Sequence, residues 1–270
     1  MNEPLRFLKQ KSTTTEYLQN TSNLIITPQM EAFLKKTQGN FELNENEIQI
    51  LTDILCSPQR DRSKSFSASQ SGTCLRAQVF QFLNTRPVRM VDTQLMQIFA
   101  DGKWRHLRWQ MFGLHAGFLK EIEVPISIPE LNFRGSVDGI GLDENGEEFV
   151  FELKGTSAFK NTQRFMPYKK HKKQGMAYLL GFSKMGRHIS KVVYIYEDKS
   201  NQEYKEIIME RDEDLIQEIQ NDIQLMNDHL QTKTLPNILV PCIKKTGPYK
   251  DCNYRNQCLK CHSLEDIEVN

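Results

Sequence analysis

The spacing of apolar residues changes along the chain from a helical period of 3.6 to a strand period of two and back. Residues 1–60 are polar with apolar positions at helical spacing. Further helices are predicted over 74–83, 92–118 (with Gly102 as a weak point), 168–183 and 212–230. Strands are predicted over 121–128, 133–154 (as a hairpin), 191–196 and 203–209. Strands that alternate with helices in this way indicate an α/β core with helical additions.

The predicted hairpin holds three charged residues among apolar ones. Asn145-Gly146 is typical of a type I′ turn, because both residues accept a positive φ. Asp138 lies on the first strand, and Glu152 and Lys154 lie on one face of the second. Strand pairing would bring the three side chains together. A divalent cation held by the two carboxylates, beside the lysine, is one explanation, and solvent-facing charges are the other.

Two helices add polar residues at i, i+4 spacing. His106 and Gln110 share one helix face, where a neutral imidazole can bind a metal ion and the amide can orient a neighbour. Gln174 and Tyr178 share another face, with Lys170 one turn earlier. That stripe can position the hairpin lysine or contact a DNA backbone. A locally satisfied histidine and an ordinary helix surface are the alternatives.

Composition and charge favour a globular protein with a polyanionic substrate. Hydrophobic residues make up 39% and charged residues 26% of the chain, which is ordinary for soluble proteins. No apolar run approaches the roughly 18 residues of a membrane span, and the first residues lack a signal-peptide core, so we expect a cytoplasmic protein. The net charge of +1 conceals two basic segments, 158–173 and 232–262, and an acidic one at 197–228. Solvated surface is the alternative reading of these segments.

Cysteine spacing predicts a metal site. Four of the six cysteines fall within the twenty residues 242–261, and in a cytoplasmic protein thiols or metal ligands are expected rather than disulfides. A local Zn²⁺ site would use all four. A [4Fe–4S] cluster could instead join Cys74 to three of them. Cys56 has no companion in the sequence and is expected to be structural. The candidate ligands are Cys74, Cys242, Cys252, Cys258 and Cys261.

Together these residues resemble the motifs of the PD-(D/E)XK nuclease superfamily. Within it they are most similar to the RecB-like branch, which includes the CRISPR-associated RecB-like exonucleases and the AddB nuclease domain. Over about 60–262, the matching motifs are Cys74-Leu-Arg76 (Cys-Pro-Arg), Gly102…His106 (Gly-x₃-His), Gly135-Ser-Val-Asp138 (Gly-x-x-Asp), Glu152-Leu-Lys154 (Glu-x-Lys) and Gln174…Tyr178 (Gln-x₃-Tyr). The chain departs from the family at Leu75, where the family has Pro, and in the ten residues that separate Cys242 from Cys252.

The resemblance implies a fold and an activity. The expected fold is a restriction-endonuclease-like core with a central mixed β-sheet flanked by helices. A helical extension is expected at 1–60, the nuclease core at 61–240 and a cysteine-rich segment at 241–270. The implied activity is a DNA exonuclease that depends on Mg²⁺ or Mn²⁺ and acts at free ends or on single strands. A helicase or a recombination or spacer-acquisition complex is the implied partner.

The resemblance also implies residue roles. The ion would be bound by His106, Asp138, Glu152 and the Leu153 carbonyl, with catalysis supported by Lys154, Gln174 and Tyr178. A structural [4Fe–4S] cluster would use Cys74, Cys242, Cys252 and Cys258, with Cys261 as a possible replacement for Cys242. DNA would be contacted by Arg76, Lys170, Lys172 and Lys173. The alternative is a nucleic-acid-binding module or accessory subunit with a structural Zn²⁺ site and a degenerate hairpin.

Overall fold

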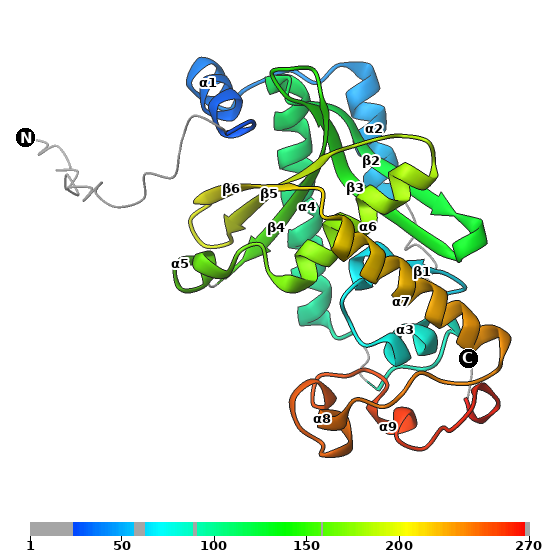
Figure 1. The fold of residues 1–270 in the computed structure, drawn as a ribbon. Helices are drawn as coiled ribbons and strands as arrows, with labels where there is room; N and C mark the ends of the chain where they lie inside the picture. Colours follow the sequence, from blue (N-terminus) through cyan, green and yellow to red (C-terminus); the bar gives the residue numbers. More distant parts are fainter. Residues whose placement is uncertain (1–23, 57–62, 89–90, 158, 268–270) are drawn as a thin grey trace, which may run out of the picture.

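A mixed β-sheet forms the centre of the protein. The computed structural model describes residues 24–56, 63–88, 91–157 and 159–267 (Figure 1). The strands are β1 (Phe66–Ser67), β2 (Leu119–Ile128), β3 (Phe133–Leu142), β4 (Glu148–Thr156), β5 (Lys191–Asp198) and β6 (Tyr204–Glu210). Their order is β1-β3-β4-β5-β6, with β2 also pairing with β3. The β4–β5 and β1–β3 pairs are parallel, and β2–β3, β3–β4 and β5–β6 are antiparallel.

Helices cover both faces of this sheet. The helices are α1 (Thr27–Thr37), α2 (Glu45–Cys56), α3 (Leu75–Phe82), α4 (Thr93–Ala116), α5 (Phe159–Thr162), α6 (Lys169–Lys184), α7 (Glu213–Gln231), α8 (Val240–Ile243) and α9 (Arg255–Cys258). The predicted central mixed β-sheet flanked by helices is therefore confirmed. None of the helices in the described ranges is long and apolar enough to span a bilayer.

The alternation of side chains on β4 and β5 divides the core into two clusters. Phe149, Phe151 and Leu153 of β4 pack with Val193 and Ile195 of β5 on the face covered by α1 and α4. The intervening residues of both strands pack on the other face, against α6 and α7: Val150, Val192, Tyr194 and Tyr196. Because the strand period is two, this division also fixes the face on which Glu152 and Lys154 lie.

The N-terminal region supplies part of the core. Ile26, Met30 and Phe33 are buried against the α4 face of the sheet. The carboxylate of Glu206 on β6 accepts hydrogen bonds from the backbone nitrogens of Ile25 (2.7 Å), Ile26 (3.0 Å) and Thr27 (2.8 Å) at the start of α1. A carboxylate at this position satisfies amides that have no partner inside the helix. The predicted helical content of 1–23 and 57–60 lies outside the described residues.

The turn between β3 and β4 differs from the predicted one. Gly146 has a φ of 77°, whereas Asn145 does not have a positive φ, so the predicted type I′ turn is wrong. The Asp143 carboxylate accepts hydrogen bonds from the amides of Asn145 and Glu147, both at 2.9 Å, and contacts Lys191 Nζ at 2.6 Å. These bonds favour a type I turn followed by a left-handed glycine.

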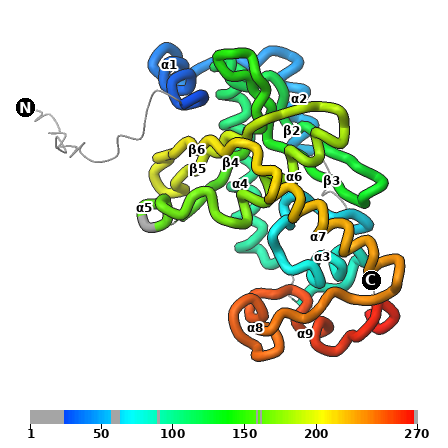
Figure 2. The backbone as a smooth tube through the Cα atoms, viewed as in Figure 1, coloured from blue at the N-terminus to red at the C-terminus, as the bar shows by residue number. Residues whose placement is uncertain are grey.

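The cysteine-rich segment folds back onto α3 (Figure 2). The Arg76 guanidinium on α3 donates to the carbonyls of Pro236 (2.8 Å), Cys258 (3.0 Å) and Cys261. The rings of Phe80 and Tyr254 stack with centroids 5.6 Å apart. The C-terminal part of the chain is thereby attached to a helix more than 150 residues earlier.

Candidate functional site

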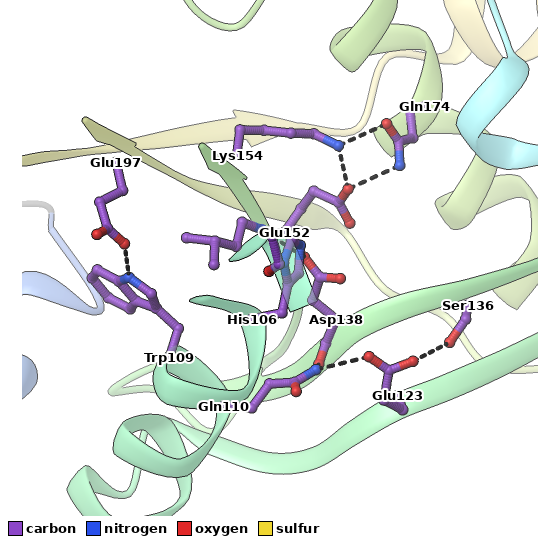
Figure 3. A network of polar contacts seen from close by, with 12 residues as sticks. His106, Trp109, Gln110, Glu123, Ser136, Asp138, Glu152, Lys154, Gln174 and Glu197 are labelled. Carbon is purple, nitrogen blue, oxygen red and sulfur yellow. Dashed lines mark hydrogen bonds and ion pairs between the residues drawn. The ribbon is translucent and has the colours of Figure 1, made fainter. Parts of the chain in front are cut away.

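Glu152 and Lys154 meet Gln174 of α6 in a largely buried polar network (Figure 3), which Tyr178 of the same helix extends. Lys154 Nζ donates to Glu152 Oε1 (2.6 Å) and to Gln174 Oε1 (2.9 Å). Gln174 Nε2 donates to the same Glu152 oxygen (2.8 Å) and to the Tyr178 hydroxyl (2.6 Å). Because Tyr178 and Glu152 accept from the amide nitrogen, the amide oxygen of Gln174 is turned toward the lysine. Of the alternatives for the Gln174 and Tyr178 stripe, the structure has Gln174 positioned beside the hairpin lysine.

Asp138 on β3 connects this network to α4. Asp138 Oδ2 accepts a hydrogen bond from the Leu153 amide (2.7 Å) and lies 3.3 Å from His106 Nε2 (Figure 3). The other ring nitrogen of His106, Nδ1, lies 2.8 Å from the Gly102 carbonyl, to which only an N–H can donate. A histidine whose Nδ1 donates to a carbonyl can offer its Nε2 lone pair to a metal ion. The helix runs unbroken through Gly102, where a weak point was predicted.

Gln110, Glu123 and Ser136 form a second layer behind Asp138. Gln110 Nε2 donates to the Asp138 carbonyl (2.8 Å) and to Glu123 Oε1 (3.0 Å), and Ser136 Oγ donates to Glu123 Oε2 (3.3 Å). Glu123 adopts a left-handed φ of 50° within β2, a conformation that non-glycine residues rarely adopt. The sequence indicated that Gln110 could orient a neighbour. It gave no signal for Glu123 or Ser136, because backbone angles at a glutamate cannot be read from residue type.

The buried carboxylate of Glu197, at the end of β5, holds α4 in place. It accepts a hydrogen bond from Arg105 (3.0 Å) and further bonds from Arg108 and Trp109. The Glu197 side chain is fully buried. Since the three donors surround His106 in the helix sequence, Glu197 fixes both the rotation and the position of the helix that presents His106. This residue was missed by the sequence analysis.

We expect Glu197→Gln to lower the free energy of unfolding by about 3 kcal/mol, because it removes the buried negative charge that pairs with Arg105 and leaves the guanidinium only the exposed Asp101. Asp101→Asn is the matched control: Asp101 contacts the same Arg105 at 2.9 Å but is 60% exposed, so its loss should change stability by less than about 1 kcal/mol. Urea denaturation of both variants checks this. Equal effects of the two substitutions would contradict the assignment of the helix anchor to Glu197.

The ionisable groups of the site lie close enough to shift one another's pKa values. Burial and the charge of Asp138 raise the pKa of Glu152 to about 7. The charge of Asp138 raises the pKa of His106 to about 9. Burial opposes ionisation of Asp138, but the charges of His106 and Lys154 hold its pKa below the ordinary value. Partial burial and the charge of Lys154 lower the pKa of Lys170, which lies on α6 one turn before the Gln174 that contacts Lys154. Two carboxylates so close together favour a cation between them.

The donor set fits a divalent cation. As the side chains stand, no three His, Cys, Asp or Glu residues in the described ranges are arranged to hold a metal ion. However, Glu152 Oε2 is buried and meets no hydrogen-bond donor among those residues. A buried acceptor without a partner is unfavourable unless something fills its place. Ligands at right angles on an octahedral ion lie about 3 Å apart, which is close to the 3.3 Å between His106 Nε2 and Asp138 Oδ2.

The structure corrects two of the four predicted DNA contacts. Arg76 is buried, and its guanidinium is used by the carbonyls of the cysteine-rich segment. Lys173 is also buried and pairs with Glu218 (2.8 Å) and Asp222 (3.4 Å) of α7. Neither side chain is presented to a nucleic acid, because each is held by partners inside the fold. Lys170 and Lys172 are exposed.

The structure brings four cysteines from distant segments into one neighbourhood. Cys74 is the N-cap of α3, Cys242 lies in α8 and Cys258 in α9. Burial raises the pKa values of Cys242 and Cys258, and each thiol also interacts electrostatically with Cys74 and Cys252. Cys261 Sγ is turned elsewhere and donates to the Asp266 carbonyl at 3.4 Å. No disulfide joins these cysteines among the described residues, and thiolates are the donors that iron–sulfur clusters and zinc take.

No protein-family model and no curated protein sequence matches the chain. Among solved structures, an alkaline exonuclease from Laribacter hongkongensis is similar at 18% identity, with a TM-score of 0.44, over 63% of this chain and 90% of the exonuclease. The same enzyme in complex with dAMP gives the same values. A protein named SSO0001 is similar at 16% identity, with a TM-score of 0.45, over 85% of this chain and 93% of that chain.

Proposed function

We propose that the protein is a nuclease that hydrolyses phosphodiester bonds of DNA with a bound Mg²⁺ or Mn²⁺ ion. The observation that supports it best is the buried network of Asp138, Glu152, Lys154 and Gln174, in which one oxygen of Glu152 meets no donor among the described residues. Two carboxylates and a histidine suit a divalent cation, and a lysine held beside them suits an anionic substrate.

Each residue of the network has a distinct role in this proposal. His106, Asp138 and Glu152, with the Leu153 carbonyl, would hold the ion. When bound, the ion supplies a nucleophilic hydroxide and neutralises charge at the scissile phosphate. Lys154 orients the attacking water and stabilises negative charge on the phosphate. Gln174 holds the Lys154 ammonium in place, and Tyr178 fixes the orientation of the Gln174 amide.

Two surfaces near the network are suited to the nucleic-acid backbone. The segment 158–173 has six Lys and Arg and no acidic residue, and within it Lys170 lies near Lys154. A cleft of about 730 Å³ borders Ser136 and Tyr178, and its lining includes the hydroxyl and cationic side chains of Ser65, Ser67, Ser69, Ser127 and Arg134. Hydroxyls and cations are the usual partners of phosphate oxygens. These surfaces support the binding of a DNA substrate through a free end or as a single strand.

The cysteines are proposed to hold a structural [4Fe–4S] cluster through Cys74, Cys242, Cys252 and Cys258. Such a cluster would join α3 to the C-terminal segment, beside the bonds that Arg76 already makes. A structural Zn²⁺ site is the alternative. A brown preparation that absorbs near about 400 nm supports iron–sulfur, whereas a colourless one with stoichiometric zinc supports Zn²⁺. A helicase or a recombination or spacer-acquisition complex remains the proposed partner, which co-purification would test.

The activity is tested by incubating the protein with 5′- and 3′-end-labelled DNA, single-stranded and duplex, with Mg²⁺, Mn²⁺ or EDTA. We expect shortened products only with a divalent cation. Mononucleotides released from one end indicate an exonuclease, and internal fragments indicate an endonuclease. Intact DNA with every divalent cation would contradict the proposal.

We expect Lys170→Gln to weaken DNA binding and to reduce the slope of log Kobs against log salt by about 1, because one phosphate contact is lost. Fluorescence anisotropy at several salt concentrations measures both effects. Lys184→Gln, at the far end of the same helix, is the matched control and should leave the slope unchanged. Equal slopes in wild type and Lys170→Gln would exclude this contact.

A further inference from the structure

The N-terminal half of α4 is exposed over 93–101, and beyond that stretch Lys103 donates to the Leu55 carbonyl of α2 at 3.1 Å. Residues 91–101 are all exposed, whereas Arg105, Leu107, Trp109 and Met111 further along the helix are buried. This half ends near the cysteine-rich segment, where the Val88 amide donates to the Asn253 carbonyl at 2.7 Å. The exposed half is unusually apolar, with exposed fractions of 37% to 56% at Leu95, Met96, Ile98 and Phe99. Apolar side chains gathered on an exposed stretch of helix indicate a binding surface.

One face of this half leads directly to the proposed metal site. Gly102, Phe99 and Leu95 precede His106 by four, seven and eleven residues, so all four lie on one helix face. We call Leu95, Phe99 and Gly102 the α4 ridge. Phe99 lies two turns, or about 10 Å along the axis, from His106. A Cβ added at Gly102 would meet nothing within 4 Å, so the space between Phe99 and His106 is open.

The charges around the ridge suit an anionic chain with apolar faces. The ridge itself contains no acidic residue, and Asp101 is turned to Arg105 on another side of the helix. At the end of the ridge lie the site residues, with Lys154 and, near it, Lys170. An unpaired nucleic-acid strand has this combination of properties, since its phosphates need cations and its bases present apolar π faces.

We propose that the α4 ridge is a base-stacking surface that takes unpaired nucleotides next to the cleaved bond, with Phe99 as the residue on which a base stacks. This inference rests on the proposed function, because it needs a phosphodiester at the His106 site. Stacking of one base on an aromatic side chain strengthens binding by about 5- to 150-fold. Bases inside a duplex are already stacked, so the ridge favours single strands and frayed ends.

The test compares Phe99→Ala, Phe99→Trp and the control Ile98→Ala in binding a fluorescein-labelled oligothymidylate, with Ca²⁺ replacing Mn²⁺. Ile98 is exposed on the same helix but points about 100° around the helix axis from Phe99. We expect Phe99→Ala to weaken binding by about 5- to 150-fold, and Phe99→Trp and Ile98→Ala to bind like wild type. On an oligonucleotide with abasic sites, wild type and Phe99→Ala should bind equally, because no base is present to stack.

Three outcomes would overturn the inference. Phe99→Ala could bind the thymidylate like wild type. It could also weaken binding of the abasic strand as much as binding of the thymidylate, which is the result that a structural role of Phe99 would produce. Sedimentation could instead show a wild-type dimer that Phe99→Ala dissociates, which would assign the ridge to a second copy of the chain. Hydrolysis of bis(p-nitrophenyl) phosphate by wild type tests the proposed function separately, since that diester has no base. Failure there, with stacking retained, would reject the chemistry and keep the binding surface.

Discussion

Asp138→Asn and Glu152→Gln should each reduce DNA cleavage with Mn²⁺ by about 10³-fold or more while the protein stays folded. Asp138 Oδ2 lies between the Leu153 amide and His106, and Glu152 Oε1 accepts from Lys154 and Gln174. The amide variants keep the shape and most of these bonds, but they remove the charge that a divalent cation needs. Initial rates on end-labelled DNA measure the loss, and circular dichroism reports the fold.

Glu144→Gln is the control for this pair of substitutions. Glu144 is an exposed carboxylate in the loop between the same two strands, so its neutralisation should leave the rate within about twofold of wild type, as expected of a surface change. Cleavage by Asp138→Asn or Glu152→Gln at the rate of this control would mean that the buried carboxylates do no chemistry. The proposed site would then be wrong even if the protein cleaves DNA.

Cys74→Ser and Cys258→Ser are expected to give colourless proteins that melt about 10 °C or more below wild type. A cluster that closes a loop of more than 160 residues restricts the unfolded chain, and a single cross-link over a loop of that size contributes about 5 kcal/mol. For a chain of this size, each kcal/mol shifts Tm by about 2–4 °C. Absorbance, iron content and thermal melts of anaerobically prepared protein provide the measurements.

The remaining cysteines supply matched controls for the ligand set. Cys261 is buried close to Cys258, but its Sγ donates to the Asp266 carbonyl, so Cys261→Ser should keep iron and colour. Cys56 is exposed on α2 and should likewise be dispensable. Loss of iron from Cys261→Ser, with iron retained by Cys242→Ser, would show that Cys261 is the ligand in place of Cys242.

The sequence predicted which site residues lie together where they are spaced regularly on one helix or one strand. Asp138, Glu152 and Lys154 follow from strand alternation, and His106 and Gln174 follow from helical spacing. The structure adds that Gln174 turns its amide oxygen toward the lysine. That orientation depends on a bond across the fold to Tyr178 and Glu152 and could not be read from local pattern.

The misses share a physical cause, which is that charge alone does not say where a side chain points. Arg76 and Lys173 were expected to contact phosphates, yet each is buried against groups far away in the chain: carbonyls after 235 and carboxylates of α7. Glu197 shows the reverse. It begins the acidic stretch 197–228, to which no role was assigned from the sequence, but it is buried beneath α4, where Arg105 neutralises it. Whether such a charged side chain is buried depends on the partner that it meets elsewhere in the folded chain.

Binding of Mn²⁺ tests the central claim, that His106, Asp138 and Glu152 form a cation site, most directly. Electron paramagnetic resonance of free Mn²⁺ during a titration counts the ions bound per chain. Wild type should bind an ion that Glu152→Gln binds at least about 10-fold more weakly, the size of effect known for altered metal sites, and that Glu144→Gln binds with unchanged affinity. Equal Mn²⁺ affinity of wild type and Glu152→Gln would contradict the account.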